Sequence, residues 1–508
     1  MKRKIKNLLC VILVLTMILL ALSSCASEEA GNNEKSGGDD NNTPGQSGGD
    51  EEEAVDENAR LPFEPTVIDL GGRNFVIGAA SWGTELTSDQ RDVFAEKDTG
   101  DSINDAVYTR NAVTGEIFNC TIVEDKYTWP GDLGSAIRKA VNGGLSTFDA
   151  AFIRYGDNLS PLSTAGMLMD LKHLPNLELS NQWWDQNSVK SLSIADRLFA
   201  VTGDIQILDK GSLSAFVFNK QLQADYQIEN LYSLVKDGKW TFPKMLEISK
   251  LISDDLNGDG VMDENDRYGL LYYRDAMPAF LAATGECIAR KDADDMPYMS
   301  FNTEKVYNAL DLIYEVIYDD TVSFHTQKNF GESDTAQFIQ KGVNMFQKNQ
   351  ALLMYVRMTE IEELRGMDTD FGILPFPKYD EAQSSYISCV NSYIGSALVV
   401  PATADPEVSG AVLEAMAYES RYTLMPAYYQ VTLKTKVGRD EESEEMLDLI
   451  FKNITYDLGG LFRFGGIESG LMNNTTSFTP ITASFYEKNE SKAIKDIDKV
   501  VEKYLGLD

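Results

Sequence analysis

One stretch of the chain carries side chains whose type and spacing suit a metal ion. Oxygen-bearing side chains occupy positions 1, 3, 5, 9 and 12 of a twelve-residue loop, namely Asp255, Asn257, Asp259, Asp263 and Asp266. Gly260 stands at position 6, where the chain must turn sharply, and Val261 can offer its backbone carbonyl at position 7. This spacing is typical of a loop that binds a hard cation. We predict a structural calcium ion here, and the alternative is an ion-free turn of Asp and Asn side chains.

The elements around this loop indicate a clip and not a calcium sensor. A helical stripe of apolar residues precedes the loop, with Thr241 as its N-cap. After the loop, residues 268–273 have the pattern of a strand, whereas a sensor would continue into a second helix. Position 12 is also Asp266 and not the longer Glu of a sensor loop. The loop is expected to join a helix to a strand.

Little else in the sequence points to catalysis. The two histidines, His173 and His325, are far apart and lack the spacing of metal ligands or of a catalytic triad. The sequence has no glycine-rich phosphate loop and no reactive-cysteine motif. We expect that the protein is not an enzyme, although its many carboxylates leave room for a glycosidase pair.

The N-terminus has the pattern of an export signal. Basic residues 2–6 precede an apolar run, Leu8 to Leu22, which is too short for a membrane span. Small residues then lead to Cys25, in a pattern that resembles the bacterial lipobox. We expect a lipid on Cys25 to anchor the protein to the outer face of the cytoplasmic membrane of a Gram-positive bacterium. An ordinary cleaved signal with an incidental cysteine is the alternative.

Residues 26–60 are rich in Gly, Ser, Asn, Asp and Glu and contain almost nothing apolar. Such a composition cannot bury enough apolar surface to offset the entropy lost on ordering. This segment is expected to be a disordered acidic tether.

Composition limits what the rest of the chain can do. With 43% hydrophobic residues, 23 Tyr and 23 Phe, it can form a large core, and its length suggests two domains or lobes. The formal charge of −34 would repel phosphate backbones, so nucleic acid is not an expected partner. Cys120, Cys287 and Cys389 are widely spaced and odd in number, which argues against a disulfide framework. We expect them to behave as small buried hydrophobes.

The first half of the body alternates strand and helix patterns. Strands are predicted around residues 75–79, 120–123 and 149–153, with helices over 103–117 and from Asp132 to Gly143. This rhythm predicts a parallel sheet covered by helices, whose ligands lie beyond the carboxyl ends of the strands.

A second region follows and includes the acidic loop. Strands are predicted at residues 213–220, 351–355, 371–375 and 394–400. The later helices are predicted from Val306 to Ile317, after Asp405, and at the C-terminus, where Ile494, Ile497, Val501 and Tyr504 share one face.

Four passages together carry a likeness to a known family. They are residues 149–157 with 166–171, residues 215–220 with 239–241, residues 342–357 with 371–377, and residues 255–269. In their order and spacing, from about Thr66 to the end, the chain resembles bacterial extracellular solute-binding proteins of family 1. These serve carbohydrate importers and are related to maltose-binding protein.

This resemblance implies a two-lobed α/β fold of the periplasmic-binding-protein type II. Each lobe is a helix-flanked sheet, crossing strands join the lobes, and the ligand is closed between them. Lobe one would comprise residues 66–214 and 380–421, and lobe two residues 215–379 and 422–508.

Within such a cleft, sugars need aromatic platforms together with planar donors and acceptors. By position in the family pattern, we expect ligand contacts from Trp82, Tyr155, Asp157, Tyr355, Arg357, Trp129 and Asn391. The remaining tryptophans, Trp183, Trp184 and Trp240, are assigned mainly to packing.

The function implied by the resemblance is capture of a carbohydrate, in particular an oligosaccharide. A monomeric receptor would deliver it to the permease subunits of an ABC importer. Two alternatives remain open: a surface protein that binds a glycan or a peptide without import, and a surface glycosidase.

Overall fold

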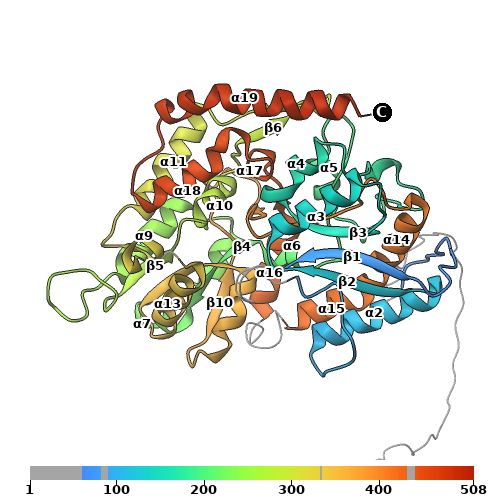
Figure 1. Ribbon diagram of the computed structural model, residues 1–508. Coiled ribbons are helices and arrows are strands. Elements are labelled where there is room, and N and C mark those ends of the chain that lie inside the picture. The colour runs from blue at the N-terminus through green and yellow to red at the C-terminus, as the bar shows by residue number, and fades with distance from the viewer. Residues whose placement is uncertain (1–59, 82–89, 332–333, 432–440, 508) are drawn as a thin grey trace, which may run out of the picture. The chain divides into compact units, whose positions relative to one another are not determined.

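Two main sheets organise the chain, and helices cover them (Figure 1). The computed structural model describes residues 60–81, 90–331, 334–431 and 441–507. Residues Arg60–Asp508 form one contact unit. No helix in these ranges is both long and apolar enough to cross a lipid bilayer.

The first sheet has the strand order β12-β3-β1-β2. Its strands are β1 (Asn74–Ala80), β2 (Thr121–Tyr127), β3 (Ala150–Arg154) and β12 (Ser396–Val399). β1 pairs in parallel with both β2 and β3, while β12 runs antiparallel to β3. The carboxyl ends of β1, β2 and β3 therefore lie at one edge, where ligands of such sheets normally bind.

Helices α2 (Ser102–Phe118) and α3 (Pro130–Asn142) pack on the first sheet. Two helices from a distant part of the chain, α14 (Pro406–Tyr422) and α15 (Leu424–Tyr429), pack against α2. Helix α3 begins two residues before the predicted Asp132, because Pro130 fits the first helical position, where no N–H is needed.

The second sheet has the order β10-β4-β9-β5-β8. Its strands are β4 (Ser214–Asn219), β5 (Tyr268–Tyr272), β8 (Ser323–His325), β9 (Ala351–Arg357) and β10 (Phe371–Leu374). β5 lies between β8 and β9 and is parallel to both, whereas β4 is antiparallel to β9. The residues that follow β8, β5 and β9 consequently share one edge of this sheet.

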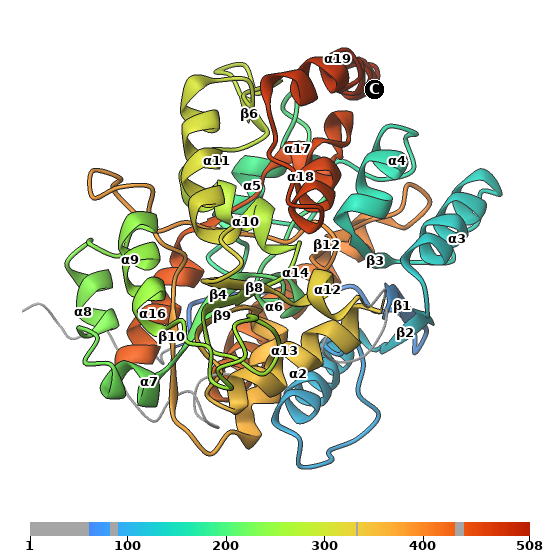
Figure 2. The same ribbon diagram turned by 90° about the vertical axis from the view of Figure 1, so that its left-hand side faces the viewer.

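The helices of this region are α7 (Lys220–Asp225), α8 (Leu231–Lys236), α9 (Phe242–Ile252), α11 (Glu304–Ile317), α12 (Thr326–Phe330), α13 (Thr335–Gln347) and α16 (Glu441–Lys452). Helix α9 has Thr241 as its N-cap, as predicted. Helices α10 (Ala276–Ala283) and α18 (Ile467–Thr476) pack side by side (Figure 2). Short elements complete the chain, namely α5 (Gln186–Leu192), α17 (Leu458–Leu461), and the strand pairs β6 (Ala289–Lys291) with β7 (Pro297–Met299) and β11 (Ser388–Cys389) with β13 (Ile454–Thr455).

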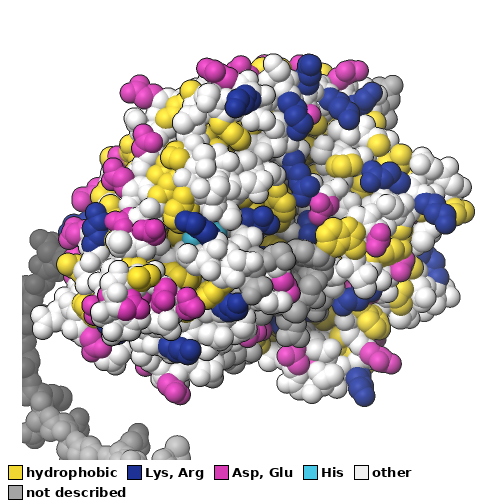
Figure 3. Space-filling view, turned by 60° about the vertical axis from the view of Figure 1, so that its left-hand side comes forward, with side chains coloured by type: hydrophobic (Ala, Val, Ile, Leu, Met, Phe, Trp, Pro, Cys, Tyr) yellow, Lys and Arg dark blue, Asp and Glu magenta, His cyan; other side chains and the backbone are white. Residues whose placement is uncertain are grey.

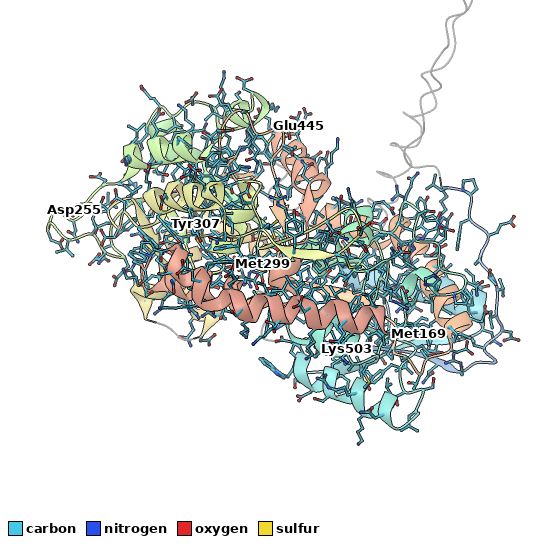
Figure 4. All side chains as sticks on the ribbon, turned by 90° about the horizontal axis from the view of Figure 1, so that it is seen from above. Met169, Asp255, Met299, Tyr307, Glu445 and Lys503 are labelled. Atoms are coloured by element: carbon cyan, nitrogen blue, oxygen red, sulfur yellow. The ribbon has the colours of Figure 1, made fainter. Side chains whose placement is uncertain are left out.

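The last helix, α19 (Ala483–Leu505), contacts parts of the chain that belong to both regions. Near its start the Tyr486 ring stacks on Phe301, and near its end the Tyr504 ring meets the edge of Phe199. Figure 4 shows α19 running from the side of Met299 and Tyr307 to the side of Met169. Its predicted buried face is only partly right, because Ile494 is 46% exposed.

The predicted strands and helices are present, and the assignment of three tryptophans to packing is confirmed by their burial. The cysteines Cys120, Cys287 and Cys389 are free. The export signal, Cys25 and the tether up to Ala59 lie outside the described residues. Arg60, at the end of the predicted tether, pairs with Glu419 at 2.9 Å.

One buried carboxylate organises the first region. The two oxygens of Glu414, on α14, accept hydrogen bonds from the indole nitrogens of Trp183 and Trp184 at 2.8 and 2.9 Å. They also accept from Asn181 Nδ2 at 2.7 Å and from the backbone N–H of Glu178 at 3.1 Å. A single carboxylate thus satisfies four donors, of which the two indole N–H groups would otherwise be buried without an acceptor.

We predict that Glu414→Ala destabilises the fold by about 3 kcal/mol or more, because each buried donor left without an acceptor costs about 1–3 kcal/mol. Urea unfolding followed by tryptophan fluorescence measures this loss. Glu414→Gln keeps one acceptor oxygen and should lose less. If the Ala variant unfolds at the wild-type urea concentration, the four donors have other acceptors.

Candidate functional site

Polar side chains gather where the carboxyl edges of the two sheets meet. β3 ends in Arg154, and a short turn follows it that contains Asp157. Arg154 is 7% exposed, and its Nη1 lies 3.4 Å from Asp157 Oδ2. The other oxygen of Asp157 accepts from Arg463 Nη2 at 3.0 Å. One carboxylate therefore joins the first sheet to a segment 306 positions later in the chain.

Gly156 is required for this arrangement. A Cβ atom on this residue would lie 2.7 Å from Nε and Nη2 of Arg463, which is closer than real Cβ atoms approach. The guanidinium of Arg463 also lies over the Tyr393 ring, 4.8 Å from its centroid. The missing side chain of Gly156 thus makes room for a guanidinium between the β3 turn and Tyr393.

The second sheet contributes a buried ion pair at the end of β9. Arg357 is fully buried, and its Nε donates to Glu360 Oε1 at 2.6 Å. The same carboxylate oxygen accepts from the Tyr273 hydroxyl at 2.6 Å. Burial by itself disfavours a charged guanidinium, but the Glu360 carboxylate raises the pKa of Arg357 above its ordinary value. Arg357 is therefore held ionised and fixed in place.

The arginines of the two sheets are close enough to affect each other. Burial lowers the pKa of Arg154 to about 10. The positive charges of Arg463 and Arg357 also lower this pKa, while Asp157 opposes the shift. Three guanidinium groups from three separate segments consequently share one site in a chain whose net charge is −34.

A pocket with an empty volume of about 270 Å³ lies beside this cluster. Asp275, which follows β5, contributes to its wall together with Asn391, Tyr393 and Glu468. The carboxylate of Glu468 accepts from the Ser392 hydroxyl at 2.6 Å. The pocket thus combines carboxylates, an amide and a phenol, the groups that hydrogen-bond hydroxyl-rich ligands.

A second pocket, of about 430 Å³, lies between residues that follow β1 and residues that follow β9. Its lining includes Ile207, Leu208 and Tyr428, and Arg91 Nη2 lies 2.6 Å from Glu362 Oε1 across it. This ion pair links the two regions at another point of the same junction.

The structure brings some of the predicted ligand residues together. Asp157 and Arg357 both neighbour Arg154, and Asn391 lines the 270 Å³ pocket. Tyr355 lies next to them but is 1% exposed, with its hydroxyl 3.1 Å from Ser214 Oγ. Their role in binding a ligand stays a prediction.

Other predicted ligand residues lie elsewhere. Tyr155 is fully buried, and its ring faces Tyr456 at 6.4 Å, so it offers no stacking surface in this conformation. Trp129 is 45% exposed and directly precedes α3. Trp82 lies outside the described residues.

Sequence reasoning missed Arg154, Arg274, Asp275, Arg463 and Glu468. Arg154 ends β3, and Arg274 and Asp275 lie two and three residues after the end of β5, so the rule that ligands bind beyond the carboxyl ends of strands could have identified them. Arg463 and Glu468 follow no strand, and only the fold places them here.

The acidic loop is remote from this cluster, and Asp255 lies at its outer end (Figure 4). The two oxygens of Asp255 accept from the N–H groups of Gly258 and Gly260. Those of the buried Asp266 accept from Leu256 and Asp263. Both ends of the loop thus fold back over its interior. The described residues hold no group of three or more His, Cys, Asp or Glu side chains arranged for a metal ion.

Solved structures with the same fold are numerous, although no protein-family model and no curated protein matches the sequence. An ABC substrate-binding protein from Listeria monocytogenes, solved with cycloalternan, has a TM-score of 0.52 at 10% identity, over 86% of this chain and 100% of its own. The M. tuberculosis protein UspC reaches 0.54 at 15% identity, over 83% and 100%. A family 1 extracellular solute-binding protein from Bifidobacterium longum subsp. infantis reaches 0.52 at 13% identity, over 86% and 100%.

These likenesses cover nearly the whole described chain and concern its fold. The protein has the two-lobed α/β fold of type II periplasmic binding proteins, as its sequence predicts. Identities of 10–15% are too low to carry over a ligand.

Glu468 provides a test of the electrostatics of the site. Burial raises its pKa to about 7 from an ordinary value of 4.5, and the nearby Asp457 also raises it. Between these two pH values the folded chain binds more protons than the unfolded chain. Glu468 therefore lowers stability progressively as the pH rises through this window.

We predict that Glu468→Gln raises the melting temperature relative to wild type by a few degrees at pH 8 and by much less at pH 4.5. Thermal unfolding across this pH range measures the difference. Glu487→Gln, at an exposed position of α19, is the control and should follow the wild-type profile. Parallel profiles for wild type and Glu468→Gln would contradict the raised pKa.

Proposed function

We propose that the protein is an extracellular receptor that captures a carbohydrate between its two lobes and delivers it to an ABC importer. The observation that carries this proposal is the convergence of Asp157, Arg357 and Arg463 from distant segments at the meeting carboxyl edges of two sheets. Such planar donors and acceptors suit the hydroxyl groups of a sugar. The shared fold with a Listeria protein solved with cycloalternan supports the ligand class.

The proposed cellular location rests on the N-terminal sequence. We propose that a lipid on Cys25 anchors a monomeric receptor to the outer face of the cytoplasmic membrane of a Gram-positive cell. Residues 26–59 would then hold the body within reach of the permease subunits. The basic, apolar and small-residue pattern before Cys25 supports this.

We predict that an oligosaccharide ligand raises the melting temperature, because it binds the folded state alone. The same ligand should reduce the radius of gyration, since only a closed form lets it contact both sheets. A thermal-shift screen of oligosaccharides, followed by small-angle X-ray scattering at saturation, tests both effects. Arg357→Ala should weaken the compaction.

The outcomes separate the proposal from its rivals. A ligand that binds without changing the radius of gyration would favour a static surface binder of glycans or peptides. Hydrolysis of the oligosaccharides during incubation with the purified protein would favour a surface glycosidase. No shift with any saccharide would contradict carbohydrate capture.

We also propose that the acidic loop binds calcium as a structural ion. The oxygen spacing supports this, as does the hydrogen bond that brings the two ends of the loop together, from the N–H of Leu256 to the Asp266 carboxylate. Exported proteins hold such ions at about 10⁻⁴–10⁻³ M.

A chelator should lower the melting temperature of the wild type, and Asp259→Ala should abolish this response. Asp237→Ala, at an exposed residue outside the loop, is the control. Equal responses of wild type and Asp259→Ala would contradict calcium binding by the loop.

A further inference from the structure

Three neighbouring strands of the second sheet end in nitrogen-bearing side chains. β9 ends in Arg357, β5 is followed after one residue by Arg274, and β8 ends in His325. β5 lies between the other two strands and parallel to both, so the three side chains form a row along its carboxyl edge. Arg154, at the end of β3, lies within electrostatic reach of Arg357 and of Arg463, and Asp157 joins Arg154 to Arg463.

His325 places an N–H group in this row without an acceptor. The residue is fully buried, and its Nδ1 accepts from the backbone N–H of Lys328 at 3.1 Å. Burial lowers the pKa of His325 to about 3, and the charges of Lys328 and Arg274 act in the same direction. The imidazole is therefore neutral, with its hydrogen on Nε2, and this buried Nε2–H has no acceptor among the residues that the structure describes.

The neighbouring arginines add further donors. Nε of Arg274 is buried and lies 3.6 Å from Asp275 Oδ1, which is too far for a hydrogen bond. Nε of Arg463 is also buried and has no acceptor within the described ranges. The Arg274 and Arg463 side chains are 38% and 35% exposed, so a ligand can reach part of each.

The carboxylates around the site are largely engaged already. Asp157 is shared by Arg154 and Arg463, and Glu360 is shared by Arg357 and Tyr273. Glu468 accepts from Ser392, and its raised pKa leaves it partly protonated at neutral pH. Asp275 is the remaining carboxylate and lies beside Arg274. The free hydrogen-bonding capacity of the site consists mainly of donors.

Among the residues that the structure describes, the aromatic rings near this row are buried or covered. Tyr273 and Tyr355 are buried, and the guanidinium of Arg463 covers Tyr393. On the face shown in Figure 3, several Lys and Arg side chains lie near the centre, and Asp and Glu side chains are spread around the outline. A cleft for neutral sugars would present aromatic faces, whereas this one presents guanidinium groups.

We propose that the ligand is an acidic saccharide, with a sugar carboxylate bound between the partly exposed Arg274 and Arg463, and with the unpartnered Nε2–H of His325 as a further donor. A carboxylate offers two acceptor oxygens and no donor, which matches the free groups of the site, and it pairs with guanidinium in a bidentate manner. This inference rests on the proposed capture of a carbohydrate and specifies its chemical class.

The importance of the ligand's negative charge can be tested by comparing each acidic saccharide with its uncharged ester, with no change to the protein. Oligouronates, such as digalacturonate and a glucuronate-containing tetrasaccharide, are titrated calorimetrically beside their methyl esters and neutral oligosaccharides of the same length. At least one free acid should bind tenfold or more tightly than its ester, because charge-assisted hydrogen bonds are about twice as strong as neutral ones. Its affinity should fall as NaCl is raised. Sulfated disaccharides distinguish a carboxylate site from a general anion site.

Variants then locate the contact. Arg274→Gln should reduce the affinity for the acidic saccharide at least tenfold and change the affinity for its ester little. Arg274→Lys keeps the positive charge and should retain part of the affinity for the acid. Arg138→Gln, on the surface of α3, is the matched control. Arg274 is partly exposed, so its variants are expected to fold, which an unchanged melting temperature would verify.

Each result decides the proposal. Neutral saccharides or esters that bind as tightly as the acids would overturn the acidic ligand and leave carbohydrate capture intact. Binding of sulfated disaccharides alone would overturn the carboxylate. Binding by no saccharide would overturn both this inference and the proposed function.

Discussion

A buried charge must be paired, and this constraint determines the architecture of the site. Asp157 compensates Arg154 and Arg463 together, and Glu360 compensates Arg357. Removing one partner from such a pair leaves an uncompensated charge, which is costly in an environment with little water. The C-terminal segment that holds Arg463 is thus tied to the first sheet by electrostatics, and Gly156 provides the space for that contact. The junction between the sheets is specified by a few ion pairs and not by apolar packing alone.

The same ion pairing distinguishes arginines that have a structural role from arginines that a ligand can reach. Arg357 lies inside its ion pair, fully buried, whereas Arg274 and Arg463 keep part of their guanidinium groups exposed. The first kind of residue fixes the position of β9, and the second kind can exchange water for a ligand. A binding site needs both, because flexible charged side chains lose entropy on binding unless neighbouring groups hold them in place beforehand.

Periodicity in the sequence predicts most of the fold, because strands and helices in this chain bury continuous apolar patterns. The runs at Phe75 and at Ala351 are read correctly from their own residues, as are caps such as Thr241. The site is predicted less well. Asp157 and Arg357 are found because each lies close to the end of a strand, whereas Arg463 becomes a neighbour of Asp157 only through long-range packing. Tyr155 shows the opposite error, since a residue next to a strand end can also turn into the core.

The contacts of α19 have a consequence for the order of folding. Its residues are synthesised after Phe199 and Phe301, yet Tyr486 covers Phe301 and Tyr504 covers Phe199, in two different regions of the chain. Until α19 docks, both phenylalanines lack these ring contacts. Both regions therefore complete their cores only after α19 has been synthesised, and earlier intermediates expose apolar surface that favours aggregation.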